Sequence, residues 1–197
     1  MKIKNIALVG NPNCGKTSLF NTLTGTRQKV ANYAGVTVER KEGSFKLPSG
    51  DAIRVLDLPG TYSLKPGSLD EEVTRAVCLG ELKGEILPDI FICVVDATNL
   101  SLHLSLVLEV RALNRPMILV LNMMDEVKKR GISINKDKLS QLLGIPVVEA
   151  VAVKTKGIQD LINQLDQKNL FITPYHSELS HFEQVKQITK QVILNND

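Results

Sequence analysis

Cysteine is scarce in this sequence, and its arrangement excludes two common roles. The 197 residues contain three cysteines, Cys14, Cys78 and Cys93. They lie far apart and are odd in number, so they offer neither the paired spacing of a metal site nor the framework of a disulfide-stapled domain. We therefore expect the protein to work in a reducing cytosol.

Long apolar runs are absent as well. The longest runs, residues 90–95 and 117–121, are far shorter than the roughly 20 residues that span a bilayer. The N-terminal residues 1–5 lead directly into a strand-like segment and lack the features of a signal peptide. We expect a soluble chain, with any membrane role supplied by sequence outside it.

Charge of either sign is not in large excess. The formal net charge is +3, with 43% hydrophobic and 23% charged residues, as in an ordinary globular domain. A nucleic-acid-binding protein would concentrate basic side chains on one face. The one dense basic cluster, residues 128–130, is typical of a solvated helix end. We expect no nucleic-acid partner.

Apolar strand-like runs alternate with helical patterns along most of the chain. Strands are expected at residues 3–9, 45–47, 53–58, 90–95, 117–121 and 146–151, and helices at 16–23, 101–113, 136–143 and 158–165. The turn at residues 48–51 makes strands 45–47 and 53–58 an antiparallel hairpin. This pattern predicts an α/β fold: a mostly parallel six-stranded sheet with one antiparallel strand and helices on both faces. Ligands bind such sheets at the carboxyl ends of the strands.

A phosphate-binding loop follows the first expected strand. The segment Gly10-Asn11-Pro12-Asn13-Cys14-Gly15-Lys16-Thr17 matches G-x-x-x-x-G-K-[ST] between a strand and a helix. The glycines let backbone N–H groups surround phosphate oxygens, and the helix N-terminus adds positive potential. Lys16 is expected on the β- and γ-phosphates and the Thr17 hydroxyl on Mg²⁺, with Ser18 next to them.

Two further motifs also end expected strands. Asp57-Leu58-Pro59-Gly60 ends the hairpin, where Asp57 would hold Mg²⁺ through water and the Gly60 N–H would contact the γ-phosphate. Asn122-Met123-Met124-Asp125 is similar to the Asn-Lys-x-Asp motif by which GTPases read guanine. The Asp125 carboxylate can accept from two guanine N–H groups, and hydrogen bonds to a charged group are worth about 1.5–3 kcal/mol each. Met123 replaces the usual lysine and can supply similar apolar contact to the base.

Three weaker assignments complete the site. Gly35-Val36-Thr37-Val38 lies where a nucleotide-sensing loop belongs, and Thr37 is the candidate to close on Mg²⁺ and the γ-phosphate. Ala152-Val153 follows the last strand and can offer a backbone N–H to guanine. Asn11, the second P-loop residue, has a neutral side-chain oxygen that suits a large, weakly hydrated cation such as K⁺. A local hydrogen-bonding role for Asn11 is the alternative.

Together these residues resemble the N-terminal cytosolic G domain of the ferrous iron transport protein B family, among the P-loop GTPases related to TrmE and Era. The most specific marks are residues 32–43 and 57–64, and the resemblance covers about residues 3–168. It implies GTP and GDP binding, Mg²⁺, and K⁺ activation known from some relatives with asparagine at this position.

The resemblance also implies a larger assembly. In that family a helical domain that acts on nucleotide release follows the G domain, and then a polytopic permease that places the full-length protein in the bacterial inner membrane. We therefore divide the chain into a GTPase domain, residues 1–170, and an amphipathic helical segment, residues 171–197. The segment either packs back on the G domain or begins the helical domain. Small cytosolic Feo accessory proteins are further expected partners.

The catalytic groups are only partly identifiable. Lys16, Thr37, Gly60 and Asn11 are the candidates, but Thr61 stands where Ras-like enzymes use a water-orienting glutamine and is too short for that task. Nothing aims Arg27 or Arg40 at the γ-phosphate, so hydrolysis is expected to be slow unaided. Two alternatives remain open, an RNA- or ribosome-associated Era-like GTPase and a binding module with negligible turnover.

Overall fold

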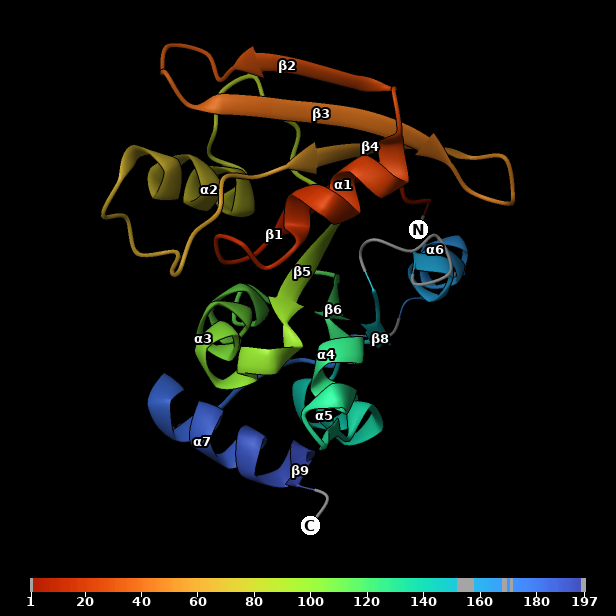
Figure 1. Cartoon of the computed structure of the whole chain (residues 1–197). Coiled ribbons are helices and arrows are strands. Elements are labelled where there is room, and N and C mark those ends of the chain that lie inside the picture. Colours follow the sequence, from red (N-terminus) through yellow and green to blue (C-terminus); the bar gives the residue numbers. More distant parts are fainter. Residues whose placement is uncertain (1, 152–157, 168–169, 171, 196–197) are drawn as a thin grey trace.

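A seven-stranded sheet forms the centre of the protein in this computed structural model, which describes residues 2–151, 158–167, 170 and 172–195 (Figure 1). The strands are β1 (Asn5–Val9), β2 (Gln28–Asn32), β3 (Glu39–Lys46), β4 (Ala52–Asp57), β5 (Ile90–Asp96), β6 (Met117–Asn122) and β8 (Val147–Glu149). Their order is β2-β3-β4-β1-β5-β6-β8, and β3 is antiparallel to both of its neighbours. The predicted α/β class, with a mostly parallel sheet, is confirmed.

Helices cover both faces, as expected from strands that are apolar on both sides. The helices are α1 (Lys16–Thr24), α2 (Leu69–Leu79), α3 (Leu100–Arg111), α4 (Met124–Lys129), α5 (Lys136–Leu143), α6 (Gln159–Asp166) and α7 (His181–Val192), with a short 3-10 turn at Ala97–Asn99 before α3. Alternate residues of β1 enter two separate cores. Ile6 and Leu8 pack with α1 and α6, whereas Ala7 and Val9 pack on the side of α2, α3 and α5. None of the described helices is long and apolar enough to cross a membrane.

The predicted number of six strands is corrected to seven, because β2 was missed. Its sequence, Gln-Lys-Val-Ala-Asn, contains one large apolar residue, Val30, and that side chain is exposed. As an edge strand β2 buries no face, so the sequence carries no hydrophobic alternation there. Helices α2 and α4 and a small two-stranded sheet of β7 (Ile132–Ile134) and β9 (Ile193–Asn195) were also not predicted.

The C-terminal helix α7 lies against α3 and α5, and Ile188 and Val192 join the core on that side (Figure 1). The connection to α7 is fixed by Arg111 at the end of α3, whose side chain is fully buried. Its guanidinium donates to the carbonyl oxygens of Leu143 and Thr173 and lies 5.1 Å from the centre of the Tyr175 ring. Whether α7 also begins a further domain stays a prediction.

Candidate functional site

The predicted motifs meet at one edge of the sheet. In the parallel register Leu8 of β1 lies opposite Asp57 of β4, and Asp96 of β5 lies opposite Asn122 of β6. The carboxyl ends of these strands therefore lie in a row. Asp57 and Asn122 are the last residues of β4 and β6, and the P-loop follows β1 directly. This is the edge where open parallel sheets bind ligands.

The P-loop connects β1 to α1 in a tight turn. A Cβ on Gly10 would lie 2.6 Å from the Val94 carbonyl oxygen and 2.7 Å from the Cys14 sulfur, so no larger residue fits there. The first turn of α1 contains no acidic residue, and no side chain caps the helix. Because first-turn N–H groups have no acceptor within their own helix, this end of α1 suits an anion.

Opposite charges meet beside this helix end. The Lys16 ammonium lies 2.5 Å from Asp57 Oδ1, and the two side chains are only 9% and 3% exposed. Neither charge is well solvated, so each depends on the other or on a ligand of the right sign. The pair brings the predicted phosphate-binding lysine and the predicted Mg²⁺-binding carboxylate to one point.

Two pockets open over this pair, of about 400 and 610 Å³. The first is lined by Lys16, Thr17, Thr37, Val38, Glu39, Lys41, Asp57, Leu58, Pro59, Gly60 and Asp70. The second is lined by Asn11, Pro12, Asn13, Gly15, Lys16, Thr17, Ser18, Gly60, Asp70 and Met123. Because they share Lys16, Thr17, Gly60 and Asp70, they form one continuous depression across the P-loop.

Asn11 is an anomaly within the described residues. The residue is 2% exposed, yet neither its amide oxygen nor its amide nitrogen has a hydrogen-bond partner there. A buried amide without a partner is costly unless a ligand satisfies it. Asn11 lines the second pocket, and its role as a cation ligand stays a prediction.

The motif predicted to read guanine is held against the P-loop. Asn122 is buried and donates from Nδ2 to the Cys14 carbonyl oxygen at 3.0 Å. Met123 takes a left-handed backbone conformation, with φ 61°, and lines the second pocket. Asp125 follows in the first turn of α4 and is half-buried.

The loop before β3 reaches the first pocket from the other side. Its two ends are buried and joined, since the Tyr33 N–H donates to the Val38 carbonyl oxygen at 3.0 Å. Between them Gly35 and Thr37 are exposed, Val36 is half-buried, and Thr37 lines the pocket. A mostly exposed tip on a buried base suits a segment that responds to a ligand.

The loop after β4 packs directly on the P-loop. A Cβ on Gly60 would lie 3.1 Å from the Pro12 Cα atom, and the Thr61 N–H donates to the Gly10 carbonyl oxygen at 3.1 Å. The Thr61 hydroxyl is buried and donates to the Ser63 carbonyl oxygen at 2.6 Å. Thr61 lines neither pocket.

Three other groups named in the sequence analysis are the P-loop cysteine, Arg40 and the segment after the last strand. Burial raises the pKa of the Cys14 thiol, so this P-loop cysteine is no ready nucleophile. Arg40 is bonded to Glu42 and Glu85. The proposed guanine contact at Ala152 and Val153 lies outside the described residues.

Asp70 lines both pockets and was not predicted. A signal for it exists in the sequence, since Ser68-x-x-Glu71 matches a capping box ahead of an apolar run. The Ser68 side chain accepts from the Glu71 N–H and begins α2, which places Asp70 in the first turn.

Known proteins with a similar sequence or structure agree on one family. A family model described as ferrous iron transport protein B matches residues 4–165. The Fe(2+) transporter FeoB of Salmonella typhimurium is 45% identical over 188 residues, which cover 93% of this chain and 23% of that protein. This chain thus spans about a quarter of the length of such relatives.

Solved structures agree closely. The cytosolic domain of FeoB from L. pneumophila has a TM-score of 0.86 and 32% identity, covering 98% of this chain and 100% of that one. The cytosolic domain of T. maritima FeoB in its GMPPNP form has a TM-score of 0.82 and 33% identity, with 98% and 100% covered. The chain belongs to the ferrous iron transport protein B family.

Proposed function

We propose that this chain binds and hydrolyses GTP and that its nucleotide state gates Fe²⁺ uptake by a membrane permease in the same full-length protein. The observation that carries the proposal is the buried pair of Lys16 and Asp57 at the P-loop, with Asn122 bonded to the same loop. The residues proposed for phosphate and metal binding thus line one depression, which Met123 of the proposed guanine-reading motif also lines.

The phosphates of GTP would lie on the amides of the P-loop and the first turn of α1, with Lys16 on the β- and γ-phosphates. Thr17, Thr37 and Asp57 offer hydroxyl and carboxylate oxygens, the ligands that Mg²⁺ prefers. Bound there, Mg²⁺ would offset negative charge on the phosphate oxygens. The Gly60 N–H, next to Pro12, would donate to the γ-phosphate.

Guanine selection would depend on Asp125, and one substitution tests it. In Asp125→Asn an amide replaces an acceptor of two guanine donors, so GTP and GDP should bind at least tenfold more weakly. Xanthosine nucleotides should bind better, because the amide can donate to their additional oxygen. Glu126→Gln, a neighbouring carboxylate bonded to Lys129, is the matched control. Unchanged guanine selectivity in competition titrations would remove Asp125 from the site.

Catalysis would rely on a monovalent cation in place of an arginine. Arg40 is engaged by Glu42 and Glu85, and Arg27 is exposed and lines neither pocket. The unpartnered oxygen of Asn11 can bind K⁺ next to the phosphates, where stabilising developing charge is usually the largest catalytic effect. K⁺ should then accelerate hydrolysis well beyond Na⁺ or Li⁺ at equal ionic strength.

Asn11→Ala should remove this preference for K⁺ while GDP affinity changes little. Equal rates of phosphate release in K⁺ and Na⁺ for the unmodified protein would exclude the cation from catalysis. A turnover that is negligible under all salts would favour the binding-module alternative instead.

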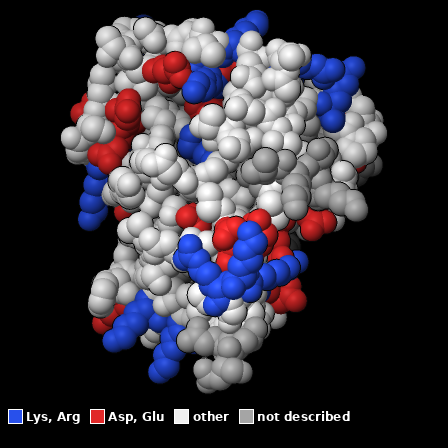
Figure 2. All heavy atoms as spheres, viewed as in Figure 1, with Lys and Arg blue, Asp and Glu red and all other residues white. Residues whose placement is uncertain are grey.

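The Era-like alternative is less well supported. On the face shown in Figure 2, lysines and arginines are interspersed with acidic side chains, and no extended basic field covers it. The proposed setting is the cytoplasmic side of the bacterial inner membrane, with small Feo proteins as accessory partners. Salt-dependent RNA binding with submicromolar affinity would contradict this assignment.

A further inference from the structure

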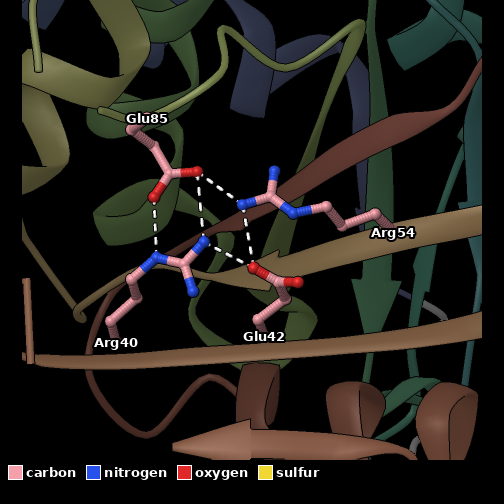
Figure 3. A network of polar contacts seen from close by, with 4 residues as sticks. All are labelled: Arg40, Glu42, Arg54 and Glu85. Atoms are coloured by element: carbon pink, nitrogen blue, oxygen red, sulfur yellow. Dashed lines mark hydrogen bonds and ion pairs between the residues drawn. The ribbon is translucent and has the colours of Figure 1, made fainter. Parts of the chain in front are cut away.

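Four charged side chains, among them Arg40 just after the Thr37 loop, form a closed network (Figure 3). Arg40 and Glu42 project from β3, Arg54 from β4, and Glu85 from the segment between α2 and β5. Glu85 is at the centre, since its carboxylate receives Arg40 Nε at 2.7 Å and Arg54 Nη2 at 2.5 Å. Glu42 closes the ring, with contacts of 2.5 Å to Arg40 and 2.9 Å to Arg54.

The Glu85 carboxylate is well protected from solvent. Its side chain is 6% exposed, although it comes from a connecting segment. Burial opposes its charged form, but hydrogen bonds from Arg40 and Arg54 outweigh burial and lower its pKa. Two guanidinium groups and two carboxylates therefore balance one another, and removing the charge of Glu85 leaves both guanidinium groups sharing the single carboxylate of Glu42.

This network fixes the strand that carries the Thr37 loop. Arg40 is two residues beyond Val38, the buried end of that loop, and Glu85 is 45 residues away in sequence. The other end of the loop, Tyr33, is buried, and its hydroxyl is near enough to Glu85 for the charge of that carboxylate to act on it. Burial first and then the charge of Glu85 raise the pKa of its hydroxyl. The network thus fixes the Val38 end of the loop, through Arg40.

The segment that carries Glu85 also connects the 33–38 loop to helix α2. Glu85 follows α2, whose Thr74 donates to the Pro59 carbonyl oxygen and whose first turn contains Asp70. Glu85 is bonded to Arg40 of β3, which follows the Thr37 loop, and lies in the segment after α2, which contains Asp70. Thr37 and Asp70 both line the first pocket.

We propose that Glu85 is a positioning residue that holds the base of the 33–38 loop so that Thr37 remains at the γ-phosphate end of the pocket. The inference depends on the proposed GTP site, because it assigns Thr37 to the triphosphate state. Glu85 itself lines neither pocket and touches no substrate. It therefore contributes to GTP affinity and hydrolysis through Thr37 and leaves GDP binding alone.

The test compares two nucleotides in Glu85→Gln. The amide keeps the shape but loses the charge, so affinity for the GTP analogue GMPPNP should fall at least fivefold and single-turnover hydrolysis by a similar factor. GDP affinity should stay within twofold. Glu81→Gln, which removes an exposed carboxylate 3.6 Å from Arg75 just after α2, is the matched control and should change neither.

The decisive measurement repeats Glu85→Gln in a Thr37→Ala background. If Glu85 acts through Thr37, the second substitution should reduce GMPPNP affinity no further. Equal losses for GDP and GMPPNP, or a full additional loss in the double variant, would overturn the inference. If Glu85→Gln does not fold, Glu85→Asp is the second variant. Its side chain is too short to keep both arginine contacts, so it too should weaken binding of GMPPNP and leave GDP affinity nearly unchanged. Failure of the unmodified protein to bind GDP would instead refute the proposed function.

Discussion

Replacing Thr61 with valine separates a structural role from a catalytic one at the residue after Asp57-x-x-Gly60. Valine keeps the volume and branching of threonine and removes only the hydroxyl. That hydroxyl is buried and donates to the Ser63 carbonyl oxygen at 2.6 Å, with Glu71 Oε1 3.3 Å away. The substitution therefore removes the donor of the Ser63 carbonyl oxygen and puts an apolar methyl group against it.

The expected cost lies in stability. Leaving a buried acceptor unsatisfied costs about 1–3 kcal/mol, so we expect a loss of roughly 2 kcal/mol in the free energy of unfolding. For a chain of this size that corresponds to a Tm lower by about 4–8 °C. Hydrolysis should remain within about tenfold, because a change below about 1.4 kcal/mol in barrier is expected for a group outside the pockets.

Thermal melts by circular dichroism and single-turnover phosphate release measure the two effects. Thr61→Ser is the control, since it keeps the hydroxyl and loses one buried methyl group, at about 0.8 kcal/mol. A hundredfold slower hydrolysis in the valine variant, with normal rates in the serine variant, would show that the hydroxyl acts on the reaction itself.

Three further substitutions test Lys16, Thr37 and Glu85. Lys16→Ala should abolish tight binding of both GDP and GTP in titrations, and retained affinity for either would contradict its place on the phosphates. Thr37→Ala should leave GDP binding nearly intact and slow hydrolysis, whereas equal losses for both nucleotides would refute a contact limited to the triphosphate. The lowered pKa of Glu85 stabilises the fold above its unfolded-state pKa near 4.5, and this contribution is lost as pH falls further. Urea denaturation should therefore show a steeper loss of stability below that pH in the unmodified protein than in Glu85→Gln.

The sequence predicted those parts of the structure that obey a local pattern. Buried parallel strands are apolar on both faces, and the P-loop joins a strand to a helix, so both are visible in short windows. Strand β2 was missed because an exposed edge strand has no such pattern. The sequence before helix α2 matches a capping box, and the first turn of α2 is the part of the site that closer attention to Ser68 and Glu71 would have found.

Long-range contacts between charged side chains were beyond prediction. Nothing near Arg40 indicates that its partner is Glu85, 45 residues away, and nothing near Lys16 gives its 2.5 Å contact with Asp57. Such pairs depend on the order of strands in the sheet. The unpartnered state of Asn11 likewise required the packing around it, although its position in the P-loop was known.

Because of the buried guanidinium of Arg111, a stable fold needs more of the chain than the residues proposed to bind nucleotide. Its donors go to carbonyl oxygens of Leu143 and Thr173, and the Tyr175 ring covers it. A chain that stopped at residue 170 would keep every residue assigned to GTP, yet it would lose Thr173 and Tyr175. Water would have to solvate a cation that now lies in the interior, and the α3 surface under α7 would be uncovered. Shortening the protein to its nucleotide-binding motifs should therefore preserve recognition of guanine while making the domain easier to unfold and more prone to aggregate.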